Sequence, residues 1–209
     1  MEDMFDDLKA LIDYIQSVYS STTAQWMNCA STKVNLKKLT ISNIDTNENI
    51  YKSIMEYTQF LNERSADILM RLSSICACKV TARVKAPNSI EYKIHNYKNN
   101  KQEKGKVPIC KCLNDLFGFR IILDFPLTYC QIHTFVEDIY HGKYRCINSS
   151  KGDYKAVHLY FKENNEVFQW ELQIWNDCDT EGNFASHKKY KQEYTTWEKE
   201  SKEGGILDD

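Results

Sequence analysis

Apolar residues recur at helical spacing in the first third of the chain. The first such stripe predicts a helix over residues 2–19 and consists of Phe5, Leu8, Leu11, Ile12, Ile15 and Val18. A second long helix is expected before residue 73, with an inner stripe of Tyr51, Ile54, Met55, Leu61, Ile68, Leu69 and Leu72. The segment between them, residues 20–47, is polar and irregular and contains a small basic cluster of Lys33, Lys37 and Lys38.

After residue 75, several segments have an apolar period of two, which is typical of strands. Extended segments are expected at residues 75–84, 116–125, 143–148, 154–161 and 166–175. Helices are expected at residues 85–98, 127–141 and 183–200, with a basic loop at residues 99–108. Helices packed on a mixed sheet predict an α/β (α+β) domain at residues 79–200. An N-terminal helical segment at residues 1–78 precedes it, and residues 201–209 form a tail.

The last of these strands has an unusual second face. Its sequence is "EVFQWELQIWN", and alternation places Phe168, Trp170, Leu172 and Ile174 on a core face. The other face carries Val167, Gln169, Glu171, Gln173 and Trp175. A carboxylate and two amides among large apolar side chains are costly to bury. The question is therefore what this second face contacts.

Polar residues also interrupt the other predicted strands or lie at their ends: Arg83, Lys85, Lys93, Asp115, Arg120, Tyr154 and His158. Two carboxylates on separate strands, Asp115 and Glu171, offer the oxygen ligands that Mg²⁺ prefers, with phosphate completing the shell. Arginines and lysines suit a polyphosphate, and a tyrosine offers a face for a base. This pattern fits a nucleotide and metal site, and it fits equally well a solvated sheet face with scattered ion pairs.

Composition narrows the classes of function only a little. With 209 residues, 42% of them hydrophobic, the chain is long enough for one domain of ordinary size. Its net charge of −2 does not indicate nucleic-acid binding, although a local basic patch could provide such binding. The acidic N-terminus does not resemble a signal peptide, and no stretch approaches the roughly 18 apolar residues of a membrane span. We therefore expect a cytoplasmic protein without membrane contact.

The chain has eight cysteines, which are expected to be reduced thiols in such a compartment. Four of them form two Cys-x-Cys pairs, Cys76/Cys78 and Cys110/Cys112. Period two would place each pair on one face of a strand, and the one-residue spacing does not match common zinc sites. Small buried hydrophobes are the favoured interpretation of these pairs.

Five segments taken together resemble a known family. "ARVKAPNSIEYK", "LNDLFGFRIILDF", "GDYKAVHLYF", "WELQIW" and "ASHKKYK" follow the order and rough spacing of the RelA/SpoT alarmone-synthetase domain, over about residues 80–195. The chain is similar to the small, synthetase-only members. The resemblance implies a nucleotidyltransferase-like fold with a mixed, mostly antiparallel sheet of about five strands flanked by helices. It also implies Mg²⁺-dependent transfer of pyrophosphate from ATP to a ribose 3′-hydroxyl, with release of AMP.

The resemblance assigns roles by position. Glu171 and Asp115 would be the catalytic and metal-binding carboxylates, with Glu171 taking the proton of the 3′-hydroxyl. Arg83 and Arg120 would sandwich the adenine, while Lys85, Ser89 and Lys93 would bind the phosphates of ATP.

On the acceptor side, the matching positions are Tyr154, which would stack on the acceptor base, and Lys155, His158 and Gln173. His187, Tyr190 and Lys191 echo a family helix motif at a different spacing. Asp153 and Lys155 replace a glycine and an arginine of the family pattern, and Trp175 replaces another arginine.

Three functions follow from this comparison. The first is a (p)ppGpp synthetase that acts on GDP or GTP. The second is a toxic small alarmone synthetase that pyrophosphorylates the 3′ CCA end of tRNA and has an antitoxin protein as its partner. The third is a nucleotide-binding module without catalysis, which the retained Asp115, Glu171, Arg83 and Arg120 argue against. The toxic synthetase is slightly favoured by the altered acceptor side, the absence of long helices after residue 200 and the basic loop. The candidate tRNA contacts on this loop are Lys98, Lys101, Lys104 and Lys106.

Overall fold

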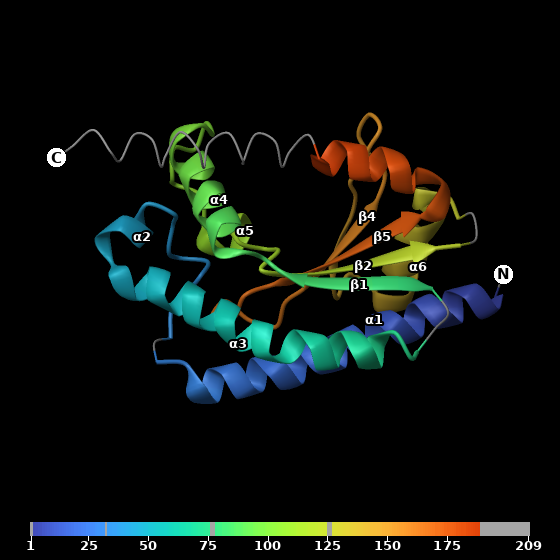
Figure 1. The fold of residues 1–209 in the computed structure, drawn as a ribbon, viewed down its shortest axis with the longest axis horizontal. Coiled ribbons are helices and arrows are strands. Elements are labelled where there is room, and N and C mark those ends of the chain that lie inside the picture. Colours follow the sequence, from blue (N-terminus) through green and yellow to red (C-terminus); the bar gives the residue numbers. More distant parts are fainter. Residues whose placement is uncertain (1, 32, 76–77, 125–126, 189–209) are drawn as a thin grey trace.

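A mixed five-stranded sheet forms the centre of the computed structural model, which describes residues 2–31, 33–75, 78–124 and 127–188 (Figure 1). Its strand order is β1-β2-β5-β4-β3. The bounds are β1 Lys79–Val84, β2 Phe117–Leu123, β3 Arg145–Asn148, β4 Val157–Phe161 and β5 Trp170–Asn176. Strands β2 and β5 pair in parallel and the other neighbours pair antiparallel. The predicted fold class, mixed and mostly antiparallel, is therefore confirmed.

Helices and short helical turns connect and cover these strands. Their bounds are α1 Glu2–Cys29, α2 Asn43–Thr46, α3 Glu48–Leu72, α4 Pro87–Asn99, α5 Ile109–Cys112, α6 Tyr129–Tyr140 and the 3₁₀ turn η1 Asp177–Asp179. Residues 180–188 are also helical. Among the described residues, no helix combines the length and apolar composition needed to cross a membrane.

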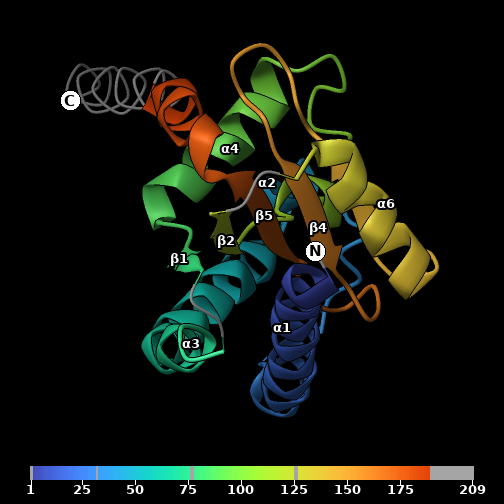
Figure 2. The ribbon, with the colours of Figure 1, turned by 90° about the vertical axis from the view of Figure 1, so that its right-hand side faces the viewer.

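One face of the sheet is buried beneath α1, α3 and α6 (Figure 2). Trp170 of β5 lies at the centre of this layer, and its indole N–H donates to the Tyr57 hydroxyl of α3 at 2.8 Å. Its ring packs edge-on against Tyr19 of α1 and Phe117 of β2. Most apolar side chains of the central strands point into this core. The polar residues lie on the opposite face of the sheet, together with the smaller apolar cluster of Ile122, Ala156 and Trp175.

Two local predictions were wrong. Helix α1 does not end near residue 19 but continues to Cys29, because Thr22 and Thr23 are buried beside Trp26 and extend the inner stripe. Cys110 and Cys112 do not lie on a strand, since the turn after Pro108 folds them into α5, where both are buried free thiols.

All five strands begin later than predicted, by one to four residues. Strand β4 starts at Val157 and β5 at Trp170, so Tyr154 and residues 166–169 lie in the segments that precede these strands. Cys76 and residues 189–209, which include Tyr190, Lys191 and the end of the predicted domain and tail, lie outside the described residues.

Candidate functional site

The register of the strands arranges two rows of side chains on the exposed face of the sheet. One row crosses β1, β2, β5 and β4 through Thr81, Arg120, Gln173 and His158. The second row crosses the same strands through Arg83, Gly118, Glu171 and Tyr160. Since Gly118 has no side chain, the sheet surface between Arg83 and Glu171 stays open. All residues of the two rows except Tyr160 line a cavity of about 660 Å³. This cavity is also lined by Lys85, Lys93, Asp115, Tyr154, Ser186 and His187.

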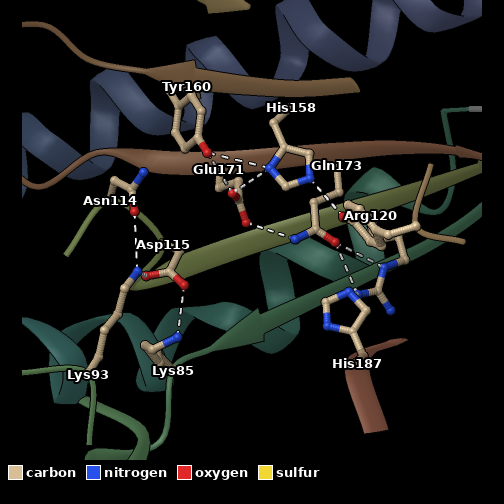
Figure 3. A network of polar contacts seen from close by, with 11 residues as sticks. Lys85, Lys93, Asn114, Asp115, Arg120, His158, Tyr160, Glu171, Gln173 and His187 are labelled. Atoms are coloured by element: carbon tan, nitrogen blue, oxygen red, sulfur yellow. Dashed lines mark hydrogen bonds and ion pairs between the residues drawn. The ribbon is translucent and has the colours of Figure 1, made fainter. Parts of the chain in front are cut away.

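Glu171 is held by three neighbours (Figure 3). The Tyr160 hydroxyl donates to its Oε1 at 3.0 Å, and His158 Nδ1 lies 3.0 Å from the same oxygen. Gln173 Nε2 donates to Oε2 at 2.9 Å. Burial favours the neutral acid, but the hydrogen bond and charge of His158 outweigh it, so the pKa of Glu171 is lowered from its ordinary value. The side chain is therefore a carboxylate at neutral pH.

His158 connects this carboxylate to Tyr154. Its Nε2 lies 2.7 Å from the Tyr154 hydroxyl. With a proton on Nδ1, the ring donates to Glu171 from that nitrogen, while Nε2 is hydrogen-bonded to the Tyr154 hydroxyl. Burial raises the pKa of Tyr154 to about 12, which keeps that hydroxyl protonated as a donor.

Asp115 lies between two lysines at the start of β2. Lys85 Nζ is 2.8 Å from its Oδ2, and Lys93 Nζ is 2.9 Å from its Oδ1. Lys85 follows β1, where its N–H donates to Leu116 O, and Lys93 projects from α4. Burial would raise the pKa of Asp115, but the two ammonium groups hold it well below its usual range. Both oxygens of this carboxylate are thus paired with cations.

Arg120 is stacked and hydrogen-bonded on the other side of the cavity. Its guanidinium lies 3.7 Å from the centre of the Trp175 ring, and its Nη2 donates to Gln173 Oε1 at 3.1 Å. His187 Nε2 is 3.4 Å from Nη2. Burial, together with the charges of Arg120 and Arg83, lowers the pKa of His187 to about 4, so this imidazole is neutral and can accept from the guanidinium.

Comparison with protein families identifies the domain that carries this cavity. Residues 82–195, more than half of the chain, match a family model described as the region found in RelA / SpoT proteins. The chain belongs to the RelA/SpoT family. The resemblance predicted from five sequence segments is therefore confirmed.

Solved structures of small alarmone synthetases from Bacillus subtilis are similar to this RelA/SpoT protein at low sequence identity. Small alarmone synthetase 1 is 17% identical with a TM-score of 0.42, over 73% of this chain and 92% of that chain. The same synthetase bound to AMPCPP is 15% identical with a TM-score of 0.38, over 78% and 93%. Small alarmone synthetase 2 is 19% identical with a TM-score of 0.37, over 69% and 80%. A search of curated proteins found no match.

Most residues assigned from the RelA/SpoT resemblance line the one cavity. They are Arg83, Lys85, Lys93, Asp115, Arg120, Tyr154, His158, Glu171, Gln173 and His187. Ser89 is not among the lining residues; it lies in the first turn of α4, where its N–H donates to Ala86 O. Lys155 also lies outside the lining, and its ammonium is 3.4 Å from Asp179.

The basic loop lies beyond the C-terminal end of α4. Lys98 forms an ion pair with Asp45 at 2.6 Å. Both residues line a second, larger cavity of about 860 Å³ between α3 and α4, and no other predicted site residue within the described part of the chain lines it. Gly105, at φ +78°, anchors the loop because its carbonyl accepts from Ser42 N–H, and a Cβ there would lie 2.3 Å from Ser42 Oγ. Three lysines on this loop are exposed: Lys101, Lys104 and Lys106.

Sequence reasoning missed two residues of the site. Tyr160, which donates to Glu171, was not assigned although strand alternation places it on the same face as His158. Trp175 was noted only as a departure from the family pattern, whereas its ring supports the Arg120 guanidinium. The first could have been predicted from period two, and the second needs the tertiary structure.

The donor set of the cavity fits a magnesium ion. Asp115 and Glu171 both line this cavity, so each can supply carboxylate oxygens to it. Oxygen-rich sites with room for substrate phosphates are the usual setting for Mg²⁺. These two residues would hold the ion.

Proposed function

We propose that this RelA/SpoT protein is an ATP-dependent 3′-pyrophosphokinase. The observation that carries the proposal is the meeting of two carboxylates, two lysines and two arginines in one cavity of about 660 Å³. A solvated sheet face would not bury Glu171 to 8% exposure or enclose Asp115 between two lysines. This geometry favours the nucleotide and metal site over scattered surface ion pairs.

The donor half of the cavity suits ATP. Trp175 covers one face of the Arg120 guanidinium, so the other face is available for stacking on a base, as a planar guanidinium allows. Arg83 lines the same cavity from β1 and would complete the adenine site. Lys85 and Lys93 are the nearest cations to Asp115, and their ammonium groups would pair with the triphosphate when ATP binds.

The transfer balances with the groups present. The acceptor 3′-oxygen attacks the β-phosphorus of ATP, the bond between that phosphorus and the α–β bridging oxygen breaks, and AMP leaves with the bridging oxygen. The proton of the 3′-hydroxyl passes to Glu171, which is ionised and held in position by Tyr160, His158 and Gln173. Mg²⁺ held by Asp115 and Glu171 would neutralise charge on the transferred phosphates.

For the acceptor we favour the 3′ end of tRNA. Tyr154 lines the cavity and would stack on the terminal base, with His158 and Gln173 beside the sugar. The exposed lysines of the loop after α4 would contact the tRNA backbone, together with Lys98. An antitoxin protein in the cytoplasm would then be the expected partner. GDP or GTP is the alternative acceptor and needs only the cavity.

One assay separates these functions. Purified protein is incubated with Mg²⁺ and γ-³²P-ATP, together with GDP, GTP or bulk tRNA, and the labelled acceptor is identified. Label on tRNA supports the toxin assignment, and label on the guanosine nucleotide supports alarmone synthesis. ATP binding without label on any acceptor would contradict the pyrophosphokinase proposal and leave a nucleotide-binding module.

A further inference from the structure

A cluster of three metal-binding side chains lies on the opposite side of the sheet from the cavity. His133 and Glu137 come from α6, and Cys146 comes from the edge strand β3. One ligand atom from each lies within 4.8 Å of the others, and all three residues are half-buried. None of them lines the catalytic cavity.

The fold brings these side chains together in a defined geometry. Residues four apart on a helix are neighbours on its surface, so His133 and Glu137 form a pair one turn apart. The adjacent stripe of α6, Ile132 and Val136, is buried in the core, which fixes the rotation of the helix. Cys146 pairs with Leu159 of β4, so its side chain lies on the core face, where α6 covers the sheet.

The ends of α6 are also well determined. At its N-terminus, Thr128 Oγ1 accepts from Gln131 N–H, while Gln131 Oε1 accepts from Thr128 N–H, which is a complete capping box. At its C-terminus, His141 adopts the left-handed conformation at φ 49° and closes the helix. Strand β3 begins within a few residues of the end of α6, so only a short loop separates Cys146 from the helix.

We propose that His133, Glu137 and Cys146 form a zinc site. An imidazole nitrogen, a thiolate and a carboxylate form a mixed donor set that suits Zn²⁺, and Mg²⁺ is disfavoured because it requires an octahedral oxygen shell. Bonds of about 2.0–2.3 Å place tetrahedral donors about 3.3–3.7 Å apart. Since no two of these ligand atoms are more than 4.8 Å apart, the separations need to close by about 1.5 Å at most, which side-chain rotations can supply. Water would take the fourth position.

Such an ion would tie α6 to the edge of the sheet. The next residue of β3, Ile147, pairs with His158, so the site is one residue from the strand pairing of His158. Burial raises the pKa of Cys146 to about 12, so metal binding must displace a proton from its sulfur. The role inferred is structural, because the ligands lie on the face away from the substrate cavity.

The test uses Co²⁺ as a spectroscopic substitute for Zn²⁺ on the full-length, metal-stripped protein in a thiol-free reductant. One equivalent of Co²⁺ should produce a thiolate-to-cobalt charge-transfer band, which Zn²⁺ should abolish and millimolar Mg²⁺ should not. Cys146→Ser should lose the band, and His133→Gln should bind at least about tenfold more weakly. The matched controls are Cys29→Ser, an exposed thiol at the end of α1, and His95→Gln on α4; both should keep the band.

A wild-type protein without the band, or a band that survives Cys146→Ser, would overturn the proposal. If Cys146→Ser does not fold by circular dichroism, the half-buried His133→Gln and Glu137→Gln variants decide. Weaker Co²⁺ binding in both supports the site, and unchanged binding in both excludes it. None of these readouts depends on pyrophosphate transfer, so the zinc proposal and the proposed enzymatic function can fail separately.

Discussion

Replacing Tyr160 with phenylalanine should slow pyrophosphate transfer by about 10- to 150-fold. The substitution removes the hydroxyl that donates to Glu171 Oε1 at 3.0 Å and keeps the ring. A hydrogen bond to a charged group contributes about 1.5–3 kcal/mol, and about 1.4 kcal/mol corresponds to a tenfold change in rate. His158 and Gln173 still hold the carboxylate, so transfer should be slowed rather than abolished.

The pH dependence of transfer provides the more specific readout. Losing a donor that stabilises the carboxylate raises the pKa of Glu171, whose pKa in the wild type is lowered by its neighbours. In its proposed role as general base, Glu171 can accept a proton only when it is ionised, so the acidic limb of the rate profile should move to higher pH in Tyr160→Phe. Single-turnover transfer of label from γ-³²P-ATP to the acceptor, measured across the acidic pH range, gives both the rate constant and the position of the acidic limb.

Tyr144→Phe is the matched control for this substitution. Tyr144 is a buried tyrosine whose hydroxyl has no hydrogen-bond partner among the described residues. Removing that hydroxyl should leave both the rate and the acidic limb unchanged. If Tyr160→Phe behaves like Tyr144→Phe, with a rate within about twofold of wild type and no shift of the limb, the Tyr160 hydroxyl does not support the catalytic carboxylate.

Four further predictions address the other parts of the site. Glu171→Gln should reduce transfer by about 10²–10⁴-fold in the labelling assay while thermal melting shows an intact fold, and activity within a few-fold of wild type would remove Glu171 from the mechanism. Arg83→Ala and Arg120→Ala should weaken ATP binding more than acceptor binding in calorimetric titrations; unchanged ATP affinity in both would refute the adenine site. Asp115→Ala leaves two lysines buried without a counter-charge, so urea unfolding should show a loss of about 3–5 kcal/mol, and a loss below about 1 kcal/mol would count against the buried ion pairs. If tRNA is the acceptor, replacing the four loop lysines Lys98, Lys101, Lys104 and Lys106 with alanine should reduce the slope of log affinity for tRNA against log salt concentration by about 0.7–0.9 per lost contact. Any labelling of GDP should be unaffected. An unchanged slope would exclude the loop as a tRNA contact.

The sheet could be predicted because its strands alternate clearly. On β2, Phe117, Phe119 and Ile121 are buried on the core face while Arg120 points into the cavity, as period two requires. The end of α1 could not be predicted in this way, because the two buried threonines near its end have the polarity of a loop. Their burial depends on the packing of α1 against α3 and the sheet, which local periodicity does not reveal.

The site was predictable to the extent that strand register determines it. Alternation already placed Glu171 and Gln173 on one face of their strand, and the pairing of β4 with β5 adds His158 to that face. The two lysines at Asp115 could be named from the family resemblance, but their ion pairs depend on how α4 crosses the start of β2. The stacking of Trp175 on Arg120 has no local signal, because the two residues are far apart in sequence and meet only through the parallel pairing of β2 with β5.

On the proposed function, the ion pairs at Asp115 would connect nucleotide binding to metal binding. Each oxygen of this carboxylate faces a lysine, and those ammonium groups are 10% and 15% exposed, so a cation arriving alone would meet two nearby positive charges. A triphosphate supplies the negative charge that can take over both lysines and free the Asp115 oxygens as ligands. Binding of ATP and of Mg²⁺ should therefore be mutually favourable, since a coupling between two ligands is equal in both directions. In this arrangement Asp115 would stay paired with its two lysines until ATP binds.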